Sequence, residues 1–205
     1  MTRLAVVDHG AGNIVSIVQG LRRAGADVVV AEHPGEIGDA AGLVLPGVGR
    51  TGAAMERLEH AGFVGVLRAW ERPLLGICVG MQLLFDASDE DGTPCLGIAP
   101  GEVVRLDDAP LLPHIGWNDV ALSGDRLFTG LGETEPFYFV HSYAPVPTTA
   151  GMVIGTAEYG ARFAAAIRHE NVAGVQFHPE RSGRAGLLVL RNFVTAAEEA
   201  AARAA

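Results

Sequence analysis

The sequence predicts an α/β fold with a central, mostly parallel sheet flanked by helices, and with additional antiparallel strands in the C-terminal half. Two observations indicate it. Through residue 85, short and nearly continuous apolar runs alternate with segments that carry apolar residues at helical spacing, which is typical of a parallel sheet covered on both faces. Beyond residue 86, many Gly and Pro residues separate short apolar stretches, which favours strands and turns. At 205 residues, we expect one domain.

In the first half, the expected elements are strand 3–8, helix 14–25, strands 27–31 and 43–45, and a helical segment 55–70. Asn13 is the expected N-cap of the first helix. In the second half they are strands 103–106, 137–140, 152–154, 162–169 and 172–177, and a closing helix 187–202. The alanines of 162–169 favour a helix, but its position between two turn regions favours the strand that we prefer.

The composition excludes several functions. A net charge of −9 argues against a nucleic-acid or anionic-membrane surface. All 15 basic residues are Arg, so a Schiff base, a lysine-anchored cofactor and a Walker-type phosphate loop are excluded, and we expect no cofactor. The seven His show no ligand spacing, so we expect no metal. Two distant cysteines suit a reducing compartment, and without a signal peptide or transmembrane run we expect a cytoplasmic protein.

Residues 73–85 (PLLGICVGMQLLF) read as a strand, a sharp turn at Cys78 and a helix. Glycines at 76 and 80 permit a tight turn that leaves the sulfur uncovered, as in a nucleophile elbow with Cys in place of Ser. At the first turn of a helix, unpaired N–H groups and the helix dipole favour a thiolate. Cys78 is therefore a candidate nucleophile, and the alternative is a small buried apolar residue.

The predicted strand 172–177 leads to His178, which a proline separates from Glu180. On extended backbone, positions two apart point the same way, so Glu180 is placed to orient an imidazole that takes the proton of Cys78. Alone, the pair also fits a surface histidine beside an unrelated glutamate. Together with Cys78, however, all three groups lie at ends of predicted strands, where α/β sheets bind ligands.

The stretch Leu45 to Gly49 (LPGVG) also follows a short apolar run. Its two glycines leave backbone N–H groups uncovered, which suits an oxyanion hole, where removal of one donor costs roughly 2.7–4 kcal/mol in other enzymes. A simple Pro-Gly turn is the alternative.

These three stretches resemble those of the class I, or triad, glutamine amidotransferases, whose nucleophile motif is similar to GICVGMQ and whose histidine motif is similar to FHPE. Further stretches resemble the glutaminase subunits of imidazole glycerol phosphate synthases. They are VVDHGAGNIVSIVQGL, LPGVG, PHIGWN at 113–118, and FYFVHSYAPVP at 137–147 followed by GVQFHPERSGRAGLLVLRNF. The resemblance covers most of the chain and treats residues 1–205 as one amidotransferase domain.

The resemblance implies hydrolysis of the side-chain amide of glutamine through a γ-glutamyl thioester, in a heterodimer with a (β/α)8-barrel cyclase. Ammonia would pass through a tunnel to the cyclase. The cyclase would use it on a phosphoribosyl-ribulosyl imidazolecarboxamide intermediate, to yield imidazole glycerol phosphate and an aminoimidazole carboxamide ribotide for histidine biosynthesis.

By position, the resemblance makes Cys78 the nucleophile, His178 the base and then the acid, and Glu180 the orienting group. The other implied roles are backbone donors to the oxyanion, contacts to glutamine, and contacts to the partner. The implied oxyanion donors are the backbone groups of Gly47, Val48, Gly49 and Val79. The implied glutamine contacts are Gln82, Glu90, Ser142 and Tyr143. The implied partner contacts are Asn13, Tyr138, His141 and Arg181. From the residues alone, Gln82 lies one helical turn after Cys78. A solvated helix face or acidic loop stays the alternative for the polar pocket residues, and cross-strand packing for the aromatic ones.

Three residues depart from the family pattern. His9 replaces the usual Tyr, Arg181 replaces the Lys after HPE, and Arg50 is unusual after PGVG. Arg keeps the charge of Lys but not its shape, so a salt bridge to the cyclase would have a different geometry.

We expect a glutaminase that is nearly silent alone and active with a loaded cyclase, because the segment 47–49 can hold its N–H groups turned away until triggered. Two alternatives stay open. One is the glutaminase subunit of pyridoxal phosphate synthase, although no GGEST-like motif is present. The other is a non-catalytic binding protein of the same fold.

Overall fold

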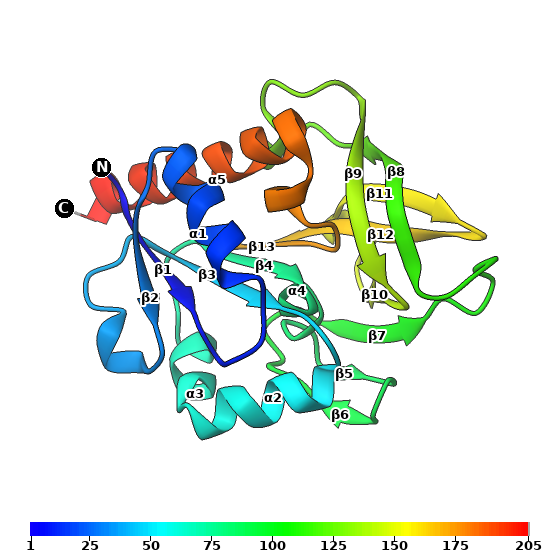
Figure 1. Ribbon diagram of the computed structural model, residues 1–205, viewed down its shortest axis with the longest axis horizontal. Helices are drawn as coiled ribbons and strands as arrows, with labels where there is room; N and C mark the ends of the chain where they lie inside the picture. Colours follow the sequence, from blue (N-terminus) through cyan, green and yellow to red (C-terminus); the bar gives the residue numbers. More distant parts are fainter. Residues whose placement is uncertain (205) are drawn as a thin grey trace.

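The computed structural model describes residues 1–204, which fold around a nine-stranded mixed sheet (Figure 1). Its strands, in spatial order, are β2 (Asp27–Ala31), β1 (Arg3–Val7), β3 (Gly42–Gly47), β4 (Leu74–Cys78), β13 (Val172–Val175), β12 (Ala161–His169), β11 (Val153–Tyr159), β8 (His114–Leu122) and β9 (Thr134–His141). Neighbours are parallel from β2 to β13 and antiparallel from β13 to β9. The predicted α/β class, with antiparallel strands added in the C-terminal half, is confirmed.

A smaller sheet of short strands lies beside the antiparallel half. Its order is β10 (Tyr143–Pro147), β7 (Gly101–Arg105), β5 (Ala87–Ser88) and β6 (Thr93–Pro94). Strand β9 of the large sheet leads through Ser142 into β10 of the small one. Because the Val140 carbonyl near the end of β9 lies 3.7 Å from Cys78 Sγ, this connection between the sheets lies beside the end of β4.

Helices cover both faces of the parallel strands. Figure 1 shows α1 (Ile14–Arg23) and α5 (Gly183–Ala204) on one side and α2 (Thr51–His60) and α3 (Phe63–Arg68) on the other. Every residue of β3 and β4 is buried as a result. The remaining helical elements are α4 (Val79–Gln82), η1 (Pro34–Glu36), η2 (Arg126–Phe128), η3 (Ala150–Met152) and η4 (Pro179–Arg181).

Most expected elements match, including the strand at 162–169, and two differ. The helical segment 55–70 is divided at Gly62, whose φ of 77° is a left-handed conformation that ends α2 and starts α3. The helix after Cys78 ends at Gln82 instead of continuing to Phe85, because the carbonyls of Leu83, Leu84 and Phe85 accept hydrogen bonds from backbone N–H groups of residues 96–99. No helix in residues 1–204 is both long and apolar enough to cross a membrane.

Strand register brings the three informative stretches together. Gly47 of β3 pairs with Cys78 of β4, so the LPGVG stretch leaves the sheet beside the elbow. On the other side of β4, Val175 of β13 pairs with Ile77, so the chain leading to His178 leaves at the same edge. This edge is the carboxyl end of the parallel strands, where α/β sheets bind ligands.

Candidate active site

Cys78 lies at the predicted sharp turn between β4 and α4. Its backbone has φ 54° and ψ −114°, a strained conformation for a residue with a Cβ atom. The turn is possible because glycines lie two residues before and two residues after Cys78. A Cβ at Gly76 would lie 2.7 Å from the Gly80 carbonyl oxygen, and one at Gly80 only 1.8 Å from the Leu45 carbonyl oxygen. The two glycines therefore let the elbow pack against β3.

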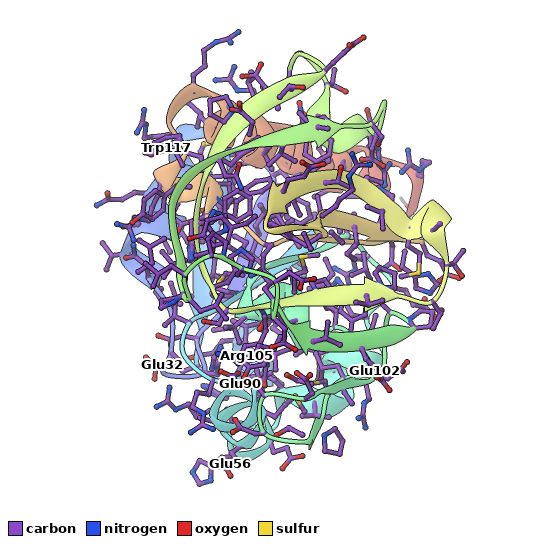
Figure 2. The ribbon with its side chains drawn as sticks, turned by 90° about the vertical axis from the view of Figure 1, so that its right-hand side faces the viewer. Glu32, Glu56, Glu90, Glu102, Arg105 and Trp117 are labelled. Atoms are coloured by element: carbon purple, nitrogen blue, oxygen red, sulfur yellow. The ribbon has the colours of Figure 1, made fainter. Side chains whose placement is uncertain are left out.

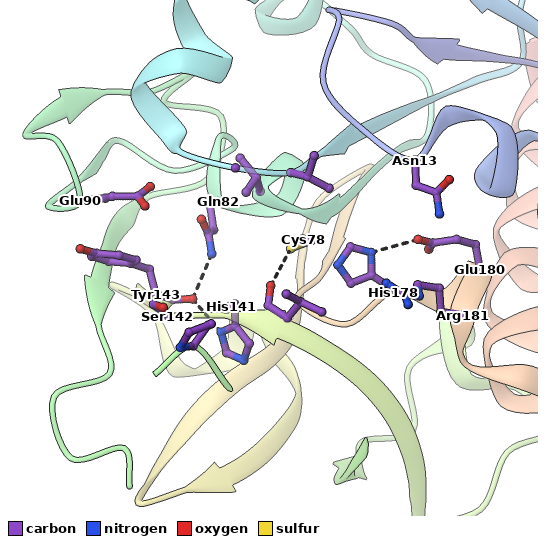
Figure 3. Close-up of a pocket in the computed structure, with 15 residues that line it drawn as sticks. Asn13, Cys78, Gln82, Glu90, His141, Ser142, Tyr143, His178, Glu180 and Arg181 are labelled. Carbon is purple, nitrogen blue, oxygen red and sulfur yellow. Dashed lines mark hydrogen bonds and ion pairs between the residues drawn. The ribbon is translucent and has the colours of Figure 1, made fainter. Parts of the chain in front are cut away.

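The sulfur of Cys78 lies between a donor and an acceptor. Gln176 Nε2 donates to Sγ at 3.6 Å. The Val140 carbonyl oxygen lies 3.7 Å from Sγ as an acceptor (Figure 3). Gln176 is fully buried. Sequence reasoning missed it, although a polar residue within a buried-type strand was a usable signal.

His178 and Glu180 form the expected pair. His178 Nδ1 lies 2.9 Å from Glu180 Oε1, and the carboxylate side chain is fully buried. Burial alone would lower the pKa of His178, but its interactions with Cys78 and Glu180 outweigh burial and raise the pKa to about 10. His178 therefore holds a proton near neutral pH, next to the sulfur.

A hydrogen-bonded loop fixes His178. Its backbone N–H donates to the Tyr138 carbonyl oxygen at 2.9 Å, and its own carbonyl accepts from Ser182 Oγ at 2.7 Å. Ser182 Oγ also accepts from the Tyr138 N–H at 3.0 Å. Strand β9 and the turn η4 are thus joined directly behind the imidazole.

The segment Gly47–Gly49 leaves β3 in contact with the elbow. A Cβ at Gly47 would lie 2.7 Å from the Gly80 backbone nitrogen, and Gly49 has a left-handed φ of 86°. Val48 is 41% exposed and lines the same cavity as Cys78. That the backbone N–H groups of Val48 and Val79 donate hydrogen bonds to an oxyanion stays a prediction.

His9, one of the departures from the family pattern, supports the start of this segment. The Pro46 carbonyl accepts a hydrogen bond from His9 Nε2 at 2.9 Å, and the His9 ring is buried. Burial is the main cause that lowers the pKa of His9. A neutral ring with its proton on Nε2 therefore anchors the residue before Gly47.

A cavity of about 300 Å³ opens over the sulfur. The expected glutamine contacts Gln82, Glu90, Ser142 and Tyr143 all line it. Figure 3 shows Glu90 and Tyr143 on the side away from His178. Gln82 Nε2 donates to the Tyr143 carbonyl at 3.0 Å, and Glu90 Oε2 accepts from the N–H of Thr51 at 2.9 Å. These bonds hold the amide and the carboxylate side chain at the rim opposite the histidine.

The residues expected at a partner interface differ in position. Asn13 and Arg181 are exposed at the cavity mouth, and the Arg181 guanidinium lies 4.5 Å over the Tyr138 ring. His141 is buried, is bonded on both ring nitrogens and lines the cavity, and its contact with a partner stays a prediction. Asn13 is the N-cap residue of α1 as expected, but its side chain makes no capping hydrogen bond.

Among the described residues, the histidines and the two cysteines form neither a metal cluster nor a disulfide. Within residues 1–204, no three His, Cys, Asp or Glu side chains are grouped to hold a metal ion. Cys78 and Cys95 are free and buried. Burial raises the pKa of Cys95 to about 11. Cys95 thus has the character of an inert thiol, in contrast to the position of Cys78 at the cavity floor.

The family model described as Glutamine amidotransferase class-I matches residues 5–197. An imidazole glycerol phosphate synthase subunit HisH from Moorella thermoacetica is 48% identical over 198 residues, covering 94% of each chain. A protein of the same name from Halobacterium salinarum is 43% identical over 206 residues, covering 93% of this chain and 92% of its own.

Solved structures show the same fold at lower identity. A putative GMP synthase subunit from Thermoplasma acidophilum superposes with a TM-score of 0.78 at 21% identity, covering 100% of this chain and 98% of its own. A structure of PurLQS from Thermotoga maritima gives 0.73 at 20% identity, covering 95% and 98%.

Proposed function

The chain belongs to the class I glutamine amidotransferase family, and from this premise we propose that it is the glutaminase subunit of an imidazole glycerol phosphate synthase in histidine biosynthesis. The relatives favour this synthase over pyridoxal phosphate synthase. One observation carries the catalytic part of the proposal. A cysteine on a strained elbow lies at the floor of a cavity, next to a histidine that a buried carboxylate orients.

In the first step, Cys78 Sγ attacks the side-chain amide carbon of glutamine while His178 holds the proton. The tetrahedral intermediate collapses to a γ-glutamyl thioester, and His178 gives its proton to the departing nitrogen, which leaves as ammonia. Glu180 keeps Nδ1 of His178 protonated and stabilises the charged ring throughout.

In the second step, a water molecule attacks the thioester carbon. His178, now neutral, removes a proton from this water, and the C–S bond breaks to release glutamate and to restore Cys78 with the protonated imidazole. Backbone N–H groups of Gly47–Gly49 and Val79 are the proposed donors to the oxyanion in both steps. Gln82, Glu90, Ser142 and Tyr143 are the proposed contacts to glutamine.

The partner is a (β/α)8-barrel cyclase that consumes the ammonia. The proposal rests on the names of the relatives, which are subunits of a synthase, and on an exposed rim at the cavity mouth. On this rim, Asn13, Tyr138 and Arg181 are the proposed interface residues. Ile115 and Trp117, which are 60% and 58% exposed, extend it along β8, and Figure 2 shows Trp117 at the edge of the molecule.

We further propose that the partner switches the glutaminase on through the segment Gly47–Gly49. This segment carries two glycines, one with a left-handed φ, so a peptide within it can reorient at small cost. We also propose that residues 1–205 form one domain. Its two free thiols suit a reducing compartment, which supports a location in the cytoplasm.

Cys78→Ala tests the proposed chemistry, with Cys95→Ala as the matched control, since Cys95 is also a free buried thiol but does not line the cavity. In the complex with the cyclase, Cys78→Ala should abolish glutamine-dependent product and preserve ammonia-dependent product, while Cys95→Ala preserves both. Unchanged glutamine-dependent activity in Cys78→Ala would refute the proposal and support a non-catalytic binding protein. Fast glutamine hydrolysis by the isolated chain, unchanged by the cyclase, would refute the switch alone.

A further inference from the structure

Two buried histidines form a hydrogen-bonded chain that ends at the candidate glutamine pocket. His114 of β8 and His141 of β9 are cross-strand partners, with His114 Nδ1 3.0 Å from His141 Nε2. His141 Nδ1 lies 2.8 Å from the Tyr143 carbonyl oxygen. At the other end, Asn118 Nδ2 approaches His114 Nε2 at 3.5 Å. The chain therefore runs from the middle of β8 to the residue that follows Ser142.

The direction of every bond follows from one fixed acceptor. The Tyr143 carbonyl only accepts, so His141 Nδ1 carries the proton and its Nε2 accepts. His114 Nδ1 must then donate to His141, which leaves His114 Nε2 as an acceptor. The amide of Asn118 matches this order, because its Nδ2 also donates to the Glu158 carbonyl at 2.9 Å. Both rings are thus Nδ1–H tautomers.

This order requires two neutral imidazoles. Burial is the main cause that lowers the pKa of both rings, in His141 to about 4, where the nearby His114 and His178 lower it further. Near neutral pH, both rings therefore keep one donor and one acceptor nitrogen each, as the chain needs.

Aromatic packing holds the first ring in place. The His114 ring stacks on Tyr159, with centroids 3.9 Å apart and planes inclined by 19°, and on Phe139 at 5.0 Å and 20°. Rotation of this ring out of its plane would open both stacks, and a half-turn within the plane would place a C–H group where Nδ1 now donates to His141. The ring is therefore preorganised to present Nδ1 to His141.

The chain ends on a carbonyl that two elements share. The Tyr143 oxygen accepts from His141 Nδ1 and also from Gln82 Nε2 at 3.0 Å, so both of its lone pairs are used. Gln82 belongs to α4, which starts directly after Cys78. The same carbonyl thus joins the elbow helix to the turn that carries Ser142 and Tyr143, which both line the cavity with His141 (Figure 3).

Building on the proposed function, we propose that His114 and His141 are positioning residues for glutamine binding, which act by fixing the Tyr143 carbonyl and with it the Ser142–Tyr143 wall of the pocket. His114 does this without lining the cavity itself. Loss of its Nδ1–H leaves His141 Nε2 buried without a donor, and the wall loses its support from β8.

The test uses two His114 variants in the complex with the cyclase. His114→Phe keeps a stacking ring and removes both hydrogen bonds, whereas His114→Asn places an amide N–H close to the position of Nδ1 and keeps the bond to His141. We expect His114→Phe to raise the KM for glutamine about tenfold with kcat changed less than about threefold, and His114→Asn to return the KM to within about threefold of the parent.

The ammonia-dependent reaction and thermal unfolding serve as controls for assembly and folding. In a folded His114→Phe complex, an unchanged KM would overturn the proposal. So would equal KM increases in His114→Phe and His114→Asn, since the ring shape and not the hydrogen bond would then matter. If the parent complex itself fails to hydrolyse glutamine, the proposed function fails first, and the tautomer measurement still decides the present inference.

That measurement is ¹⁵N NMR of the imidazole nitrogens in the full chain, with resonances assigned by their loss in His114→Asn and His141→Asn. We expect Nδ1–H tautomers for both rings near neutral pH. In His114→Phe, we expect the ¹⁵N resonances of the His141 ring to broaden, because its Nε2 has lost its hydrogen-bond donor. An Nε2–H tautomer or a charged ring at either position overturns the chain.

Discussion

Replacing Glu180 with Gln should change the pH profile of glutamine hydrolysis as well as its rate. The variant keeps the size of the side chain and an oxygen within reach of His178 Nδ1, which lies 2.9 Å from Glu180 Oε1, but it removes the charge. The carboxylate is fully buried, and its second oxygen has no hydrogen-bond partner in the described chain. Little solvent therefore screens its interaction with the imidazolium.

A hydrogen bond to a charged group contributes roughly 1.5–3 kcal/mol. At 1.36 kcal/mol per pKa unit, replacing this charge-assisted bond with a neutral one should lower the pKa of His178 by about one to two units from its value of about 10. His178 must hold a proton to release ammonia, so activity is lost as pH rises through this pKa. The alkaline limb of kcat/KM should therefore move to lower pH by about one to two units, with a rate loss of about 10- to 100-fold at its optimum.

The assay measures glutamate release in the assembled complex across the pH range around the pKa of His178, with the ammonia-dependent reaction as a control. Glu198→Gln is the matched variant, since it removes one negative charge from an exposed position on α5 and should leave the profile unchanged. A rate loss in Glu180→Gln without any movement of the alkaline limb would refute the electrostatic role that we give to Glu180. An unaltered rate would refute its participation altogether.

Two predictions concern stability. Gly80→Ala places a methyl group 1.8 Å from a backbone oxygen of β3, so urea unfolding should show a free energy of unfolding lower by at least about 3 kcal/mol. Gly65→Ala, at an exposed helical position with nothing within 4 Å, should raise the free energy of unfolding by about 0.5–1 kcal/mol. Equal effects of the two substitutions would contradict the close approach at Gly80. Arg168→Met breaks two 2.7 Å bonds to Asp125 and should cost about 2–4 kcal/mol, against less than about 1 kcal/mol for the exposed Arg162→Met. Burial raises the pKa of Asp125, but its hydrogen bonds, first to Arg168, lower the pKa overall. The ion pair therefore stabilises the fold above the ordinary pKa of aspartate, and this stabilisation is lost as pH falls through the pKa of Asp125 in the folded state. A cost of Arg168→Met that persists in strong acid would contradict the ion pair.

The sequence was sufficient to predict the parallel half of the fold and the strand ends that carry Gly47, Cys78 and His178. Buried parallel strands are read as continuous apolar runs, and each of the stretches around Gly47, Cys78 and His178 ends such a run. Because parallel strands end at a common edge, predicting the strands places these residues on that edge, and they meet there because β3 and β13 are the two neighbours of β4. Local signals thus determine this part of the site.

The other side of the site depends on contacts that no local pattern encodes. His114 and His141 face one another only through the register of β8 and β9, and Gln176 reaches the sulfur only because β13 lies next to β4. The length of α4 is likewise set by backbone bonds from residues 96–99. Polar residues in such positions look like surface residues until the pairing of distant strands is known.

The two faces of β8 give a physical basis for communication between a partner and the glutamine pocket. Ile115 and Trp117 point outward and are exposed, while His114 and Asn118, which lie on either side of them along the strand, take part in the hydrogen-bonded chain. If β8 shifts relative to β9 when a partner binds its outer face, His114 Nδ1 also shifts relative to His141. Because a buried hydrogen bond tolerates only small changes of distance and angle, a small shift is enough to alter the support of the Tyr143 carbonyl. The strand that supports the pocket through His114 thus also carries Ile115 and Trp117 of the proposed interface.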